Sequence, residues 1–262
     1  MRQMRVNKLK AKIKRGDPVL GTFLFFPSPH TVELLGYAGF DFVIVDTEHG
    51  PTGPLDTVLL ENLIRASEVA DITPLVRIPE RSRVVTQKIL DAGALGVVVP
   101  FIHSGEETRE AVLDTKYPPQ GHRGACYLTR PTAYTTKWSE EYWSDANRET
   151  MVVPMIEDQA AVEKIDEILD VPGVDFVFFG GRDHSMTCGY PTPSNPATQA
   201  ARKRLSEACA RRGIPLAHFL YPPFEKSVQE GLRSGAKILV AGGDNALLLQ
   251  ILQSTVKAFH SG

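Results

Sequence analysis

The stretch FDFVIVDTEHG, residues 40–50, is an apolar run that ends abruptly in charged residues. The run is apolar at successive positions rather than alternate ones, which is typical of a parallel strand covered by helices on both faces. Asp46, Glu48 and His49 follow it within four positions. Folds built from such strands carry their chemistry at the carboxyl ends of the strands. The stretch therefore predicts an α/β fold with a functional site at one end of its sheet.

Similar apolar runs recur along the chain and alternate with amphipathic helical patterns. The candidate strands are 18–26, 40–46, 72–78, 95–102, 151–157, 174–180, 214–220 and 237–242. Several helical patterns end in Gly just before the next strand, as a helix C-cap requires. Eight such strands in 262 residues predict a single-domain (β/α)8 TIM barrel covering 1–262. A doubly wound open sheet is the alternative, but no glycine-rich fingerprint follows the first strand.

One segment interrupts this alternation. Residues 117–149 read YPPQGHRGACYLTRPTAYTTKWSEEYWSDANRE and are rich in Pro, Gly, aromatic and charged residues. A long irregular insertion between a strand and a helix is usually a functional loop or an oligomer contact. We expect it to lie outside the core.

Composition excludes several classes of function. The net charge of −2 gives no basic field for nucleic acid, and no apolar run approaches the roughly 20 residues that span a membrane. The basic N-terminus lacks the apolar core of a signal peptide, and we expect it to begin a solvated helix. Three scattered cysteines (Cys126, Cys188 and Cys209) without CxxC spacing indicate a reducing compartment and no structural zinc site. The cytoplasm is the expected location.

Two carboxylates follow neighbouring strands of the predicted barrel. Glu157 ends the strand 151–157, and Asp183 follows the strand 174–180. Such a pair can bind one hard divalent cation, with water and substrate oxygens as the remaining ligands. The structural alternative is that these acidic positions cap the following helices, with Asp158 serving the first of them.

A second group of charged residues follows strands two and three. Arg77 ends an apolar strand, where a cation needs an anionic ligand or an ion pair with Asp46 or Glu48. His49 could be a simple hydrogen-bonded residue, or a base whose tautomer is fixed by Asp46. Glu48 could only anchor the loop.

The lysines argue against one mechanism. A Schiff-base aldolase needs a desolvated Lys at the carboxyl end of a strand, whereas Lys237 begins its strand and Lys116 and Lys137 lie in or beside the irregular segment. The AGGDN turn, 241–245, could bind phosphate, but it needs no ligand as a tight turn into the last helix.

The order of the motifs resembles that of the HpcH/HpaI aldolases, which are metal-dependent class II pyruvate aldolases. The motifs are DTEHGP, LVRIPE, LDAGA, YPPQGHRG, MIED, GGRDHS and VAGGDN, spread from about Gly21 to Asn245. The resemblance implies a (β/α)8 barrel, commonly hexameric, that cleaves or forms 4-hydroxy-2-oxo acids. It also implies a divalent cation (Mg2+, Mn2+ or Co2+), with pyruvate and an aldehyde as the reacting partners.

Catalytic roles follow from the resemblance by position. Glu157 and Asp183 match the metal ligands, which pyruvate completes with its carboxylate and oxo oxygens. Arg77 matches the residue that stabilises the enolate oxygen. His49, paired with Asp46, matches the base.

The resemblance also implies contacts at the edge of the site. Asp91 matches an acid that reaches a neighbouring subunit's site, and the backbone amides around Arg182 and Asp183 match groups that bind the pyruvate carboxylate. The family often has Gln where this chain has Met155. Its usual GPADLS reads GGRDHS here, which places Arg182 and His184 beside the metal-binding Asp. These departures leave the aldehyde and the reaction open.

Three other functions compete with the aldolase. The same site could decarboxylate oxaloacetate or couple the enolate to another acceptor as a carbon–carbon synthase. A lyase of acyl-CoA thioesters would need a basic surface that the sequence lacks. A catalytically silent barrel that binds a dicarboxylate would bind its ligand without turnover.

Overall fold

Eight strands form one sheet in the computed structural model, which describes residues 4–260. They are β1 (Val19–Leu24), β2 (Phe42–Asp46), β3 (Thr73–Arg77), β4 (Gly96–Val99), β5 (Met151–Ile156), β6 (Phe178–Phe179), β7 (Ala217–Phe219) and β8 (Ile238–Gly243). The order in the sheet is β6-β5-β4-β3-β2-β1-β8-β7, and every neighbouring pair is parallel. Consecutive strands are therefore paired, except β6 and β7, which stand at the two ends of this order, and β1 also pairs with β8.

The two ends of this sheet meet and close it. Val177 and Leu216 form a parallel bridge between the segments of β6 and β7. The Val177 amide donates to Pro215 O at 3.0 Å, and the Ala217 amide donates to Val177 O at 2.8 Å. The predicted (β/α)8 barrel is therefore confirmed, and the open sheet is not formed.

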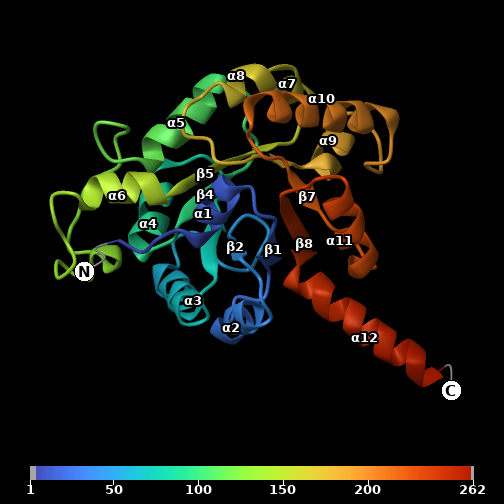
Figure 1. Cartoon of the computed structure of the whole chain (residues 1–262), viewed down its shortest axis with the longest axis horizontal. Coiled ribbons are helices and arrows are strands. Elements are labelled where there is room, and N and C mark those ends of the chain that lie inside the picture. The colour runs from blue at the N-terminus through green and yellow to red at the C-terminus, as the bar shows by residue number, and fades with distance from the viewer. Residues whose placement is uncertain (1–3, 261–262) are drawn as a thin grey trace.

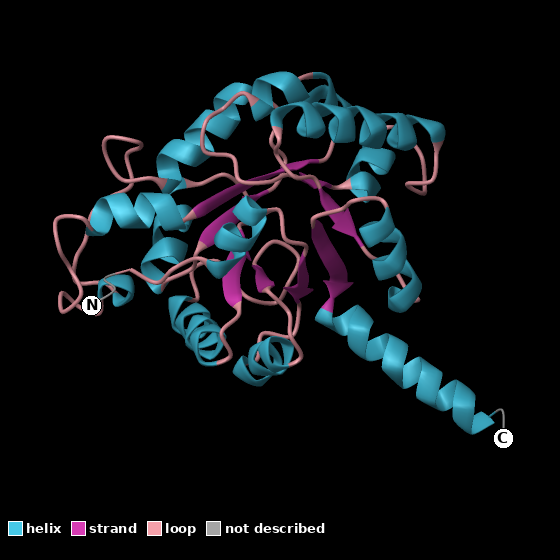
Figure 2. Cartoon of the chain, viewed as in Figure 1, coloured by secondary structure: helices cyan, strands magenta, loops and turns pink. Residues whose placement is uncertain are grey.

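Helices surround the barrel (Figures 1 and 2). They are α1 (Lys8–Arg15), α2 (Pro29–Tyr37), α3 (Thr57–Val69), α4 (Arg83–Ala92), α5 (Gly105–Thr115), α6 (Tyr142–Glu149), α7 (Gln159–Glu163), α8 (Ile165–Leu169), α9 (Gly181–Thr187), α10 (Pro196–Arg212), α11 (Phe224–Arg233) and α12 (Asp244–His260). Glycines end α4 and α10 in the left-handed conformation, at Gly93 and Gly213, as the sequence pattern predicts.

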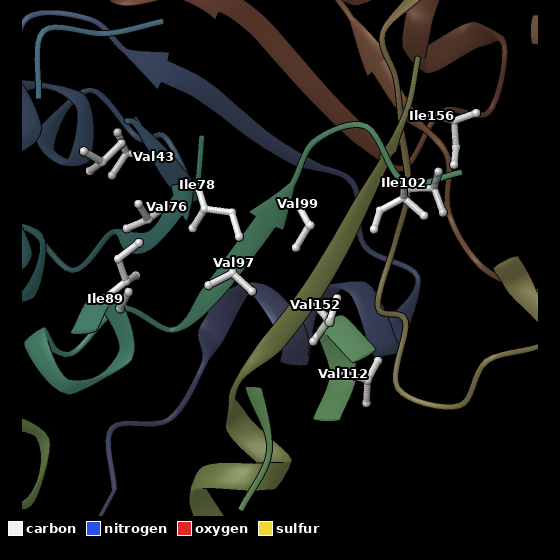
Figure 3. Close-up of a cluster of buried hydrophobic side chains, with 14 of the residues drawn as sticks. Val43, Val76, Ile78, Ile89, Val97, Val99, Ile102, Val112, Val152 and Ile156 are labelled. Atoms are coloured by element: carbon white, nitrogen blue, oxygen red, sulfur yellow. The ribbon is translucent and has the colours of Figure 1, made fainter. Parts of the chain in front are cut away.

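The strands are apolar at successive positions because they separate two apolar layers. Alternate side chains of β2 point in opposite directions: Ile44 packs inside the barrel, and Val43 packs against the helices. Figure 3 shows the outer layer, in which strand residues such as Val97 and Val152 lie near Ile89 of α4 and Val112 of α5. The parallel barrel thus needs no polar face.

The first helix differs from the expectation of a solvated segment. Leu9 of α1 is fully buried in the interior layer of the barrel, and Ile13 packs against the same layer. Asn7 caps the helix by accepting from the Lys10 amide, and its side-chain amide donates to Leu95 O and Glu149 O. Helix α1 therefore covers the amino-terminal end of the barrel with one apolar face.

The segment 117–149 is mostly loop, with a short 3-10 helix (Arg130–Thr132), but it ends in α6. Tyr142 of α6 is buried, and the ring of Trp143 lies between those of Tyr142 and Tyr117, at 5.2 and 4.5 Å. The last eight residues of the segment are therefore a packed helix, because its aromatic residues build a small apolar cluster of their own.

Candidate active site

The predicted charged residues lie at the carboxyl end of the barrel. Asp46 and Arg77 are the last residues of β2 and β3 and are register partners. Glu157 directly follows β5, and Asp183 lies in the first turn of α9, after β6. The charges of Asp183, Glu48 and Arg77 all shift the pKa of Glu157, so the four groups share one electrostatic environment.

Arg77 is held by two carboxylates. Its Nε donates to Asp46 Oδ1 at 2.9 Å, its Nη2 donates to Asp46 Oδ2, and its Nη1 lies 3.0 Å from Glu48 Oε2. The guanidinium also stacks on the ring of Phe23, 4.9 Å from its centroid. The ion pair foreseen for Arg77 is therefore formed, and it fixes the guanidinium in a single orientation.

The predicted pairing of Asp46 with the His49 side chain is not observed within the described residues. Asp46 is fully buried, and Oδ1 accepts from the backbone amides of Glu48 and His49 at 3.1 and 3.2 Å. The His49 imidazole is 62% exposed, and its Nε2 lies 3.8 Å from Glu48 Oε2. Asp46 is engaged by Arg77 and by the turn, so Glu48 is the carboxylate nearest to His49.

Glycine makes this turn possible. A Cβ at Gly50 would lie 2.2 Å from the Asp46 carbonyl oxygen, so a side chain there would force the turn open. The tight turn folds the loop back over β2. It places Glu48 beside Arg77 and leaves His49 at the surface.

Glu48 and Glu157 are carboxylates with incomplete hydrogen bonding. Oε2 of Glu48 is buried and accepts no hydrogen bond from any residue between 4 and 260, although Arg77 is near. Glu157 is 3% exposed; its Oε2 accepts from the Phe101 amide at 2.7 Å, and its Oε1 accepts no hydrogen bond from the residues that the structure describes. Burial raises the pKa of Glu157 to about 7, the Phe101 hydrogen bond lowers it, and the charges of Glu48 and Asp183 raise it further. Burial likewise raises the pKa of Glu48.

This donor set fits a hard divalent cation. Glu157 offers an oxygen without a hydrogen bond, Asp183 lines the adjoining cavity, and the acids around them carry more negative charge than Arg77 balances. Within 4–260, no three or more His, Cys, Asp or Glu side chains form a complete metal-binding group. A cation here would therefore need substrate or water oxygens as additional ligands, as Mg2+ commonly does.

The alternative that the acidic positions cap helices applies to only one of them. Asp158 caps α7, since its Oδ1 accepts from the Ala161 amide at 2.7 Å. Asp183 lies inside α9, in its first turn, and the N-cap of that helix is Gly180.

The AGGDN turn is hydrogen-bonded to the residues that follow β1. Asp244 accepts from the amides of Phe25 and Phe26 at 2.8 and 3.0 Å. This tight connection into α12 needs no ligand.

A cavity of about 220 Å³ adjoins these residues. Its polar lining is Arg77, Arg182 and Asp183, and its apolar lining includes Phe23, Phe25, Met155, Phe219 and Tyr221. A larger cavity of about 560 Å³ lies under the irregular segment near Leu95 and is lined by none of the predicted site residues. The smaller cavity is therefore the candidate active site.

The three positions that depart from the family pattern have different surroundings. Met155 is buried in the cavity wall, and Arg182 is exposed at its edge. His184 points away from the cavity: it is fully buried, with Nδ1 3.1 Å from Thr198 Oγ1 and Nε2 3.1 Å from Gln159 Oε1. His184 therefore anchors α9 to α10, and only Met155 and Arg182 can face a substrate.

Asp91 does not line the cavity of its own chain. It lies in α4 and accepts from Arg123 Nη2 at 2.8 Å, while the guanidinium of Arg123 stacks on Tyr117, 4.4 Å from the ring centroid. A role for Asp91 in catalysis therefore requires a second subunit.

Comparisons with known proteins identify the family of this chain. A parallel barrel with acids and bases at the carboxyl ends of its strands defines a TIM-barrel enzyme. The family model described as HpcH/HpaI aldolase/citrate lyase matches residues 20–250, and the chain belongs to this family as a carbon–carbon lyase.

Three similar proteins illustrate its range. A 2-dehydro-3,6-dideoxy-6-sulfogluconate aldolase from Pseudomonas putida is 37% identical over 78% of each chain. A 4-hydroxy-2-oxo-heptane-1,7-dioate aldolase from Shigella sonnei (strain Ss046) is 34% identical over 97% of this chain and 95% of its own. The crystal structure of the citrate synthase SbnG has a TM-score of 0.84 and 28% identity, covering 99% of this chain and 98% of its own.

Sequence reasoning missed two contributors to the site. Phe101 supplies a backbone amide to Glu157, and a backbone contact leaves no sign in residue type. Phe23 supports Arg77 through its ring, but it is indistinguishable in sequence from other apolar residues of β1. By contrast, the approach of Glu48 to Arg77 could be foreseen from the charge at the end of β2.

Proposed function

We propose that this enzyme is a divalent-metal-dependent aldolase that cleaves or forms 4-hydroxy-2-oxo acids through a pyruvate enolate. The observation that carries this proposal is the buried Glu157 carboxylate, with an oxygen free of hydrogen bonds, in the same charged group as Asp183 and an immobilised Arg77. Glu157 and Asp183 would bind the cation, for which Mg2+, Mn2+ and Co2+ are candidates. When bound, the cation supplies a Lewis acid that stabilises negative charge on the 2-oxo oxygen.

Arg77 provides the protein's own stabilisation of that charge. Cleavage breaks the bond between C3 and C4, and the electron pair moves onto the 2-oxo fragment as an enolate. Because Asp46 holds the guanidinium in place, Arg77 need not reorganise as this charge develops. A preorganised donor of this kind is typically worth about 3–4 kcal/mol of transition-state stabilisation.

His49 is the base in this proposal. It takes the proton of the C4 hydroxyl as the aldehyde leaves, and Glu48, 3.8 Å away, stabilises the imidazolium that results. The backbone amides around Arg182 and Asp183 would bind the carboxylate of the 2-oxo acid. Met155 and the ring of Tyr221 would face the departing aldehyde.

A carbon–carbon synthase or oxaloacetate decarboxylase is the second candidate. Similarity to a citrate synthase over nearly the whole chain supports it. Both reactions would use the same enolate, so the metal and Arg77 do not distinguish them. The distinction is the first product: an aldehyde and pyruvate from a 4-hydroxy-2-oxo acid, or CO2 from oxaloacetate.

We also propose a homo-oligomer, for which the resemblance implies a hexamer. Helix α12 extends away from the barrel (Figure 1), and apart from Asp244 little of it is buried. Its apolar residues are exposed by 48–81%: Leu248, Leu249, Ile251, Leu252, Val256 and Phe259. A helix so apolar needs a covering surface, and a second copy of the chain supplies one. Light scattering should give a multiple of the chain mass, which Ile251→Lys with Leu252→Lys lowers and Lys257→Ala does not.

Location in the cytoplasm is part of this proposal. The three cysteines are unbonded, as in a reducing compartment. No helix between residues 4 and 260 is long and apolar enough to cross a membrane.

One assay tests the reaction. Metal-free enzyme is incubated with Mg2+, Mn2+ or Co2+ and with a panel of 4-hydroxy-2-oxo acids or oxaloacetate, and pyruvate is followed by a coupled assay. We expect metal-dependent pyruvate release from at least one 4-hydroxy-2-oxo acid. Turnover of oxaloacetate alone would favour the second candidate, and tight binding of the 2-oxo acids without any turnover would identify a silent binding barrel.

A further inference from the structure

Phe101, two residues after the end of β4, has an unusual backbone conformation. Its φ of +48° lies in the left-handed region, which a bulky side chain rarely adopts. The ring is 43% exposed and contacts that of His103 at a centroid distance of 6.4 Å. Packing of the ring therefore does not explain the conformation.

The backbone conformation of Phe101 instead allows one hydrogen bond to the Glu157 carboxylate. It directs the Phe101 amide at Glu157 Oε2, 2.7 Å away. The next residue, Ile102, is buried and donates its amide to Met155 O at 3.2 Å. The chain is thus anchored against β5 just after Phe101, and the Phe101 amide turns toward the carboxylate.

The backbone of Gly180 packs closely against the Glu157 side chain. A Cβ at Gly180 would lie 2.6 Å from Glu157 Cγ and 2.8 Å from its Oε1. The Gly180 amide donates to Ile156 O at 2.9 Å, so this backbone cannot withdraw without losing a hydrogen bond to the end of β5. The Glu157 side chain can therefore take this position because residue 180 has no side chain.

We propose that Phe101 and Gly180 are positioning residues that decide which oxygen of Glu157 is offered to the divalent cation. The Phe101 amide holds Oε2, and Gly180 gives the Glu157 side chain room for the orientation in which Oε1 carries no hydrogen bond from a described residue. The strained backbone of Phe101 is retained because it orders the carboxylate before the cation arrives. This inference rests on the proposed function, in which Glu157 is a metal ligand.

Calorimetric titration of metal-free protein with Mn2+ alone tests the inference. Phe101→Gly keeps the amide and favours positive φ, so its Kd should stay within threefold of wild type. Phe101→Val is β-branched and resists positive φ, so its Kd should rise at least tenfold. Gly180→Ala should weaken binding by at least as much. Ala133→Val is the matched control, because Ala133 has a φ of +47° outside the site, and it should leave the Kd unchanged.

Two results would overturn the inference. One is a folded Phe101→Val protein with wild-type affinity for Mn2+; the other is a Phe101→Gly protein weakened as much as Phe101→Val, which would implicate the ring.

If Phe101→Val does not fold, amide hydrogen exchange tests the hydrogen bond between the Phe101 amide and Glu157 instead. Exchange at Phe101 should accelerate at least tenfold in Glu157→Ala, and unchanged protection would refute the hydrogen bond. Wild-type Mn2+ affinity in Glu157→Gln would instead refute the proposed ligand itself, so the two failures are distinguishable.

Discussion

The two ends of the barrel each bury charged groups, but these groups differ in how completely they are hydrogen-bonded. At the amino-terminal end, Lys116 is 4% exposed and donates to Asn147 O, Thr150 O and Thr150 Oγ1 at 2.8, 2.7 and 3.1 Å. Lys10 there pairs with Asp175 at 2.8 Å. At the carboxyl end, Glu48 Oε2 is buried without a hydrogen bond, and Glu157 has one bonded oxygen.

This difference indicates which buried charges stabilise the fold and which are available to a ligand. A buried charge whose partners are complete holds elements together, and Lys116 joins the end of α5 to the start of β5. A buried carboxylate with incomplete partners destabilises the free protein and is retained where a ligand completes it. The carboxyl end is therefore where we expect a ligand to bind, and the amino-terminal end is its support.

The largest effect is expected from Glu157→Gln, which removes a charge at the carboxyl end. Metal-dependent turnover should fall at least about 10^4-fold, because the variant loses the proposed metal ligand and the stabilisation that would depend on it. The metal-free variant should nevertheless be more stable than wild type at pH 8. The folded-state pKa of Glu157, about 7, lies above the usual 4.5, so the unfolded chain releases this proton first and the folded protein loses stability as the pH rises from about 4.5 to about 7.

Steady-state kinetics and thermal melts at pH 5 and pH 8 measure both effects. The gain in melting temperature should be larger at pH 8 than at pH 5. Equal stability at both pH values would show that Glu157 is not destabilised by its surroundings, and the contrast between the two ends would fail.

A smaller effect of the opposite kind is expected from Lys116→Met at the amino-terminal end. The substitution removes three hydrogen bonds and leaves Asn147 O and Thr150 Oγ1 without this donor, while Thr150 O keeps the Lys10 ammonium at 3.1 Å. It should lower the free energy of unfolding by about 2–4 kcal/mol. The folded variant should keep kcat within about twofold, since Lys116 does not line the cavity. Chemical denaturation and kinetics below the melting temperature check this; a large loss of kcat in folded protein would contradict the division of roles.

The sequence was sufficient for the barrel because its strands are apolar on both faces. Runs such as 40–46 admit few structures other than a covered parallel strand, and residues that end neighbouring strands must lie at the same edge. The convergence of Arg77, Glu157 and Asp183 could be predicted for that reason. Leu9 could not, because one apolar residue in a basic segment does not show that a barrel end needs a cover.

Pairing between side chains was harder to predict than their location. Asp46 and His49 are three residues apart, yet the turn uses the Asp46 carboxylate for its own amides and for Arg77, and His49 is left near Glu48. Loop geometry decides which of several nearby side chains forms the hydrogen bond or ion pair. Residue types do not encode that geometry directly. The positive φ of Phe101 and the hydrogen bond from its amide to Glu157 likewise could not be predicted from residue type.

The smallest effect is a pH dependence of metal affinity, and it compares the two ends directly. In metal-free protein Glu157 keeps its proton up to a pH of about 7, so the cation must displace it in acid. The affinity for Mn2+ should therefore rise about tenfold per pH unit between pH 5 and pH 7 and then level off. Burial also lowers the pKa of Lys116 to about 7, so a second group titrates in the same window at the other end. Calorimetry on Lys116→Met resolves the two: an unchanged profile assigns the proton to the carboxyl end, and a flattened one assigns it to the amino-terminal end.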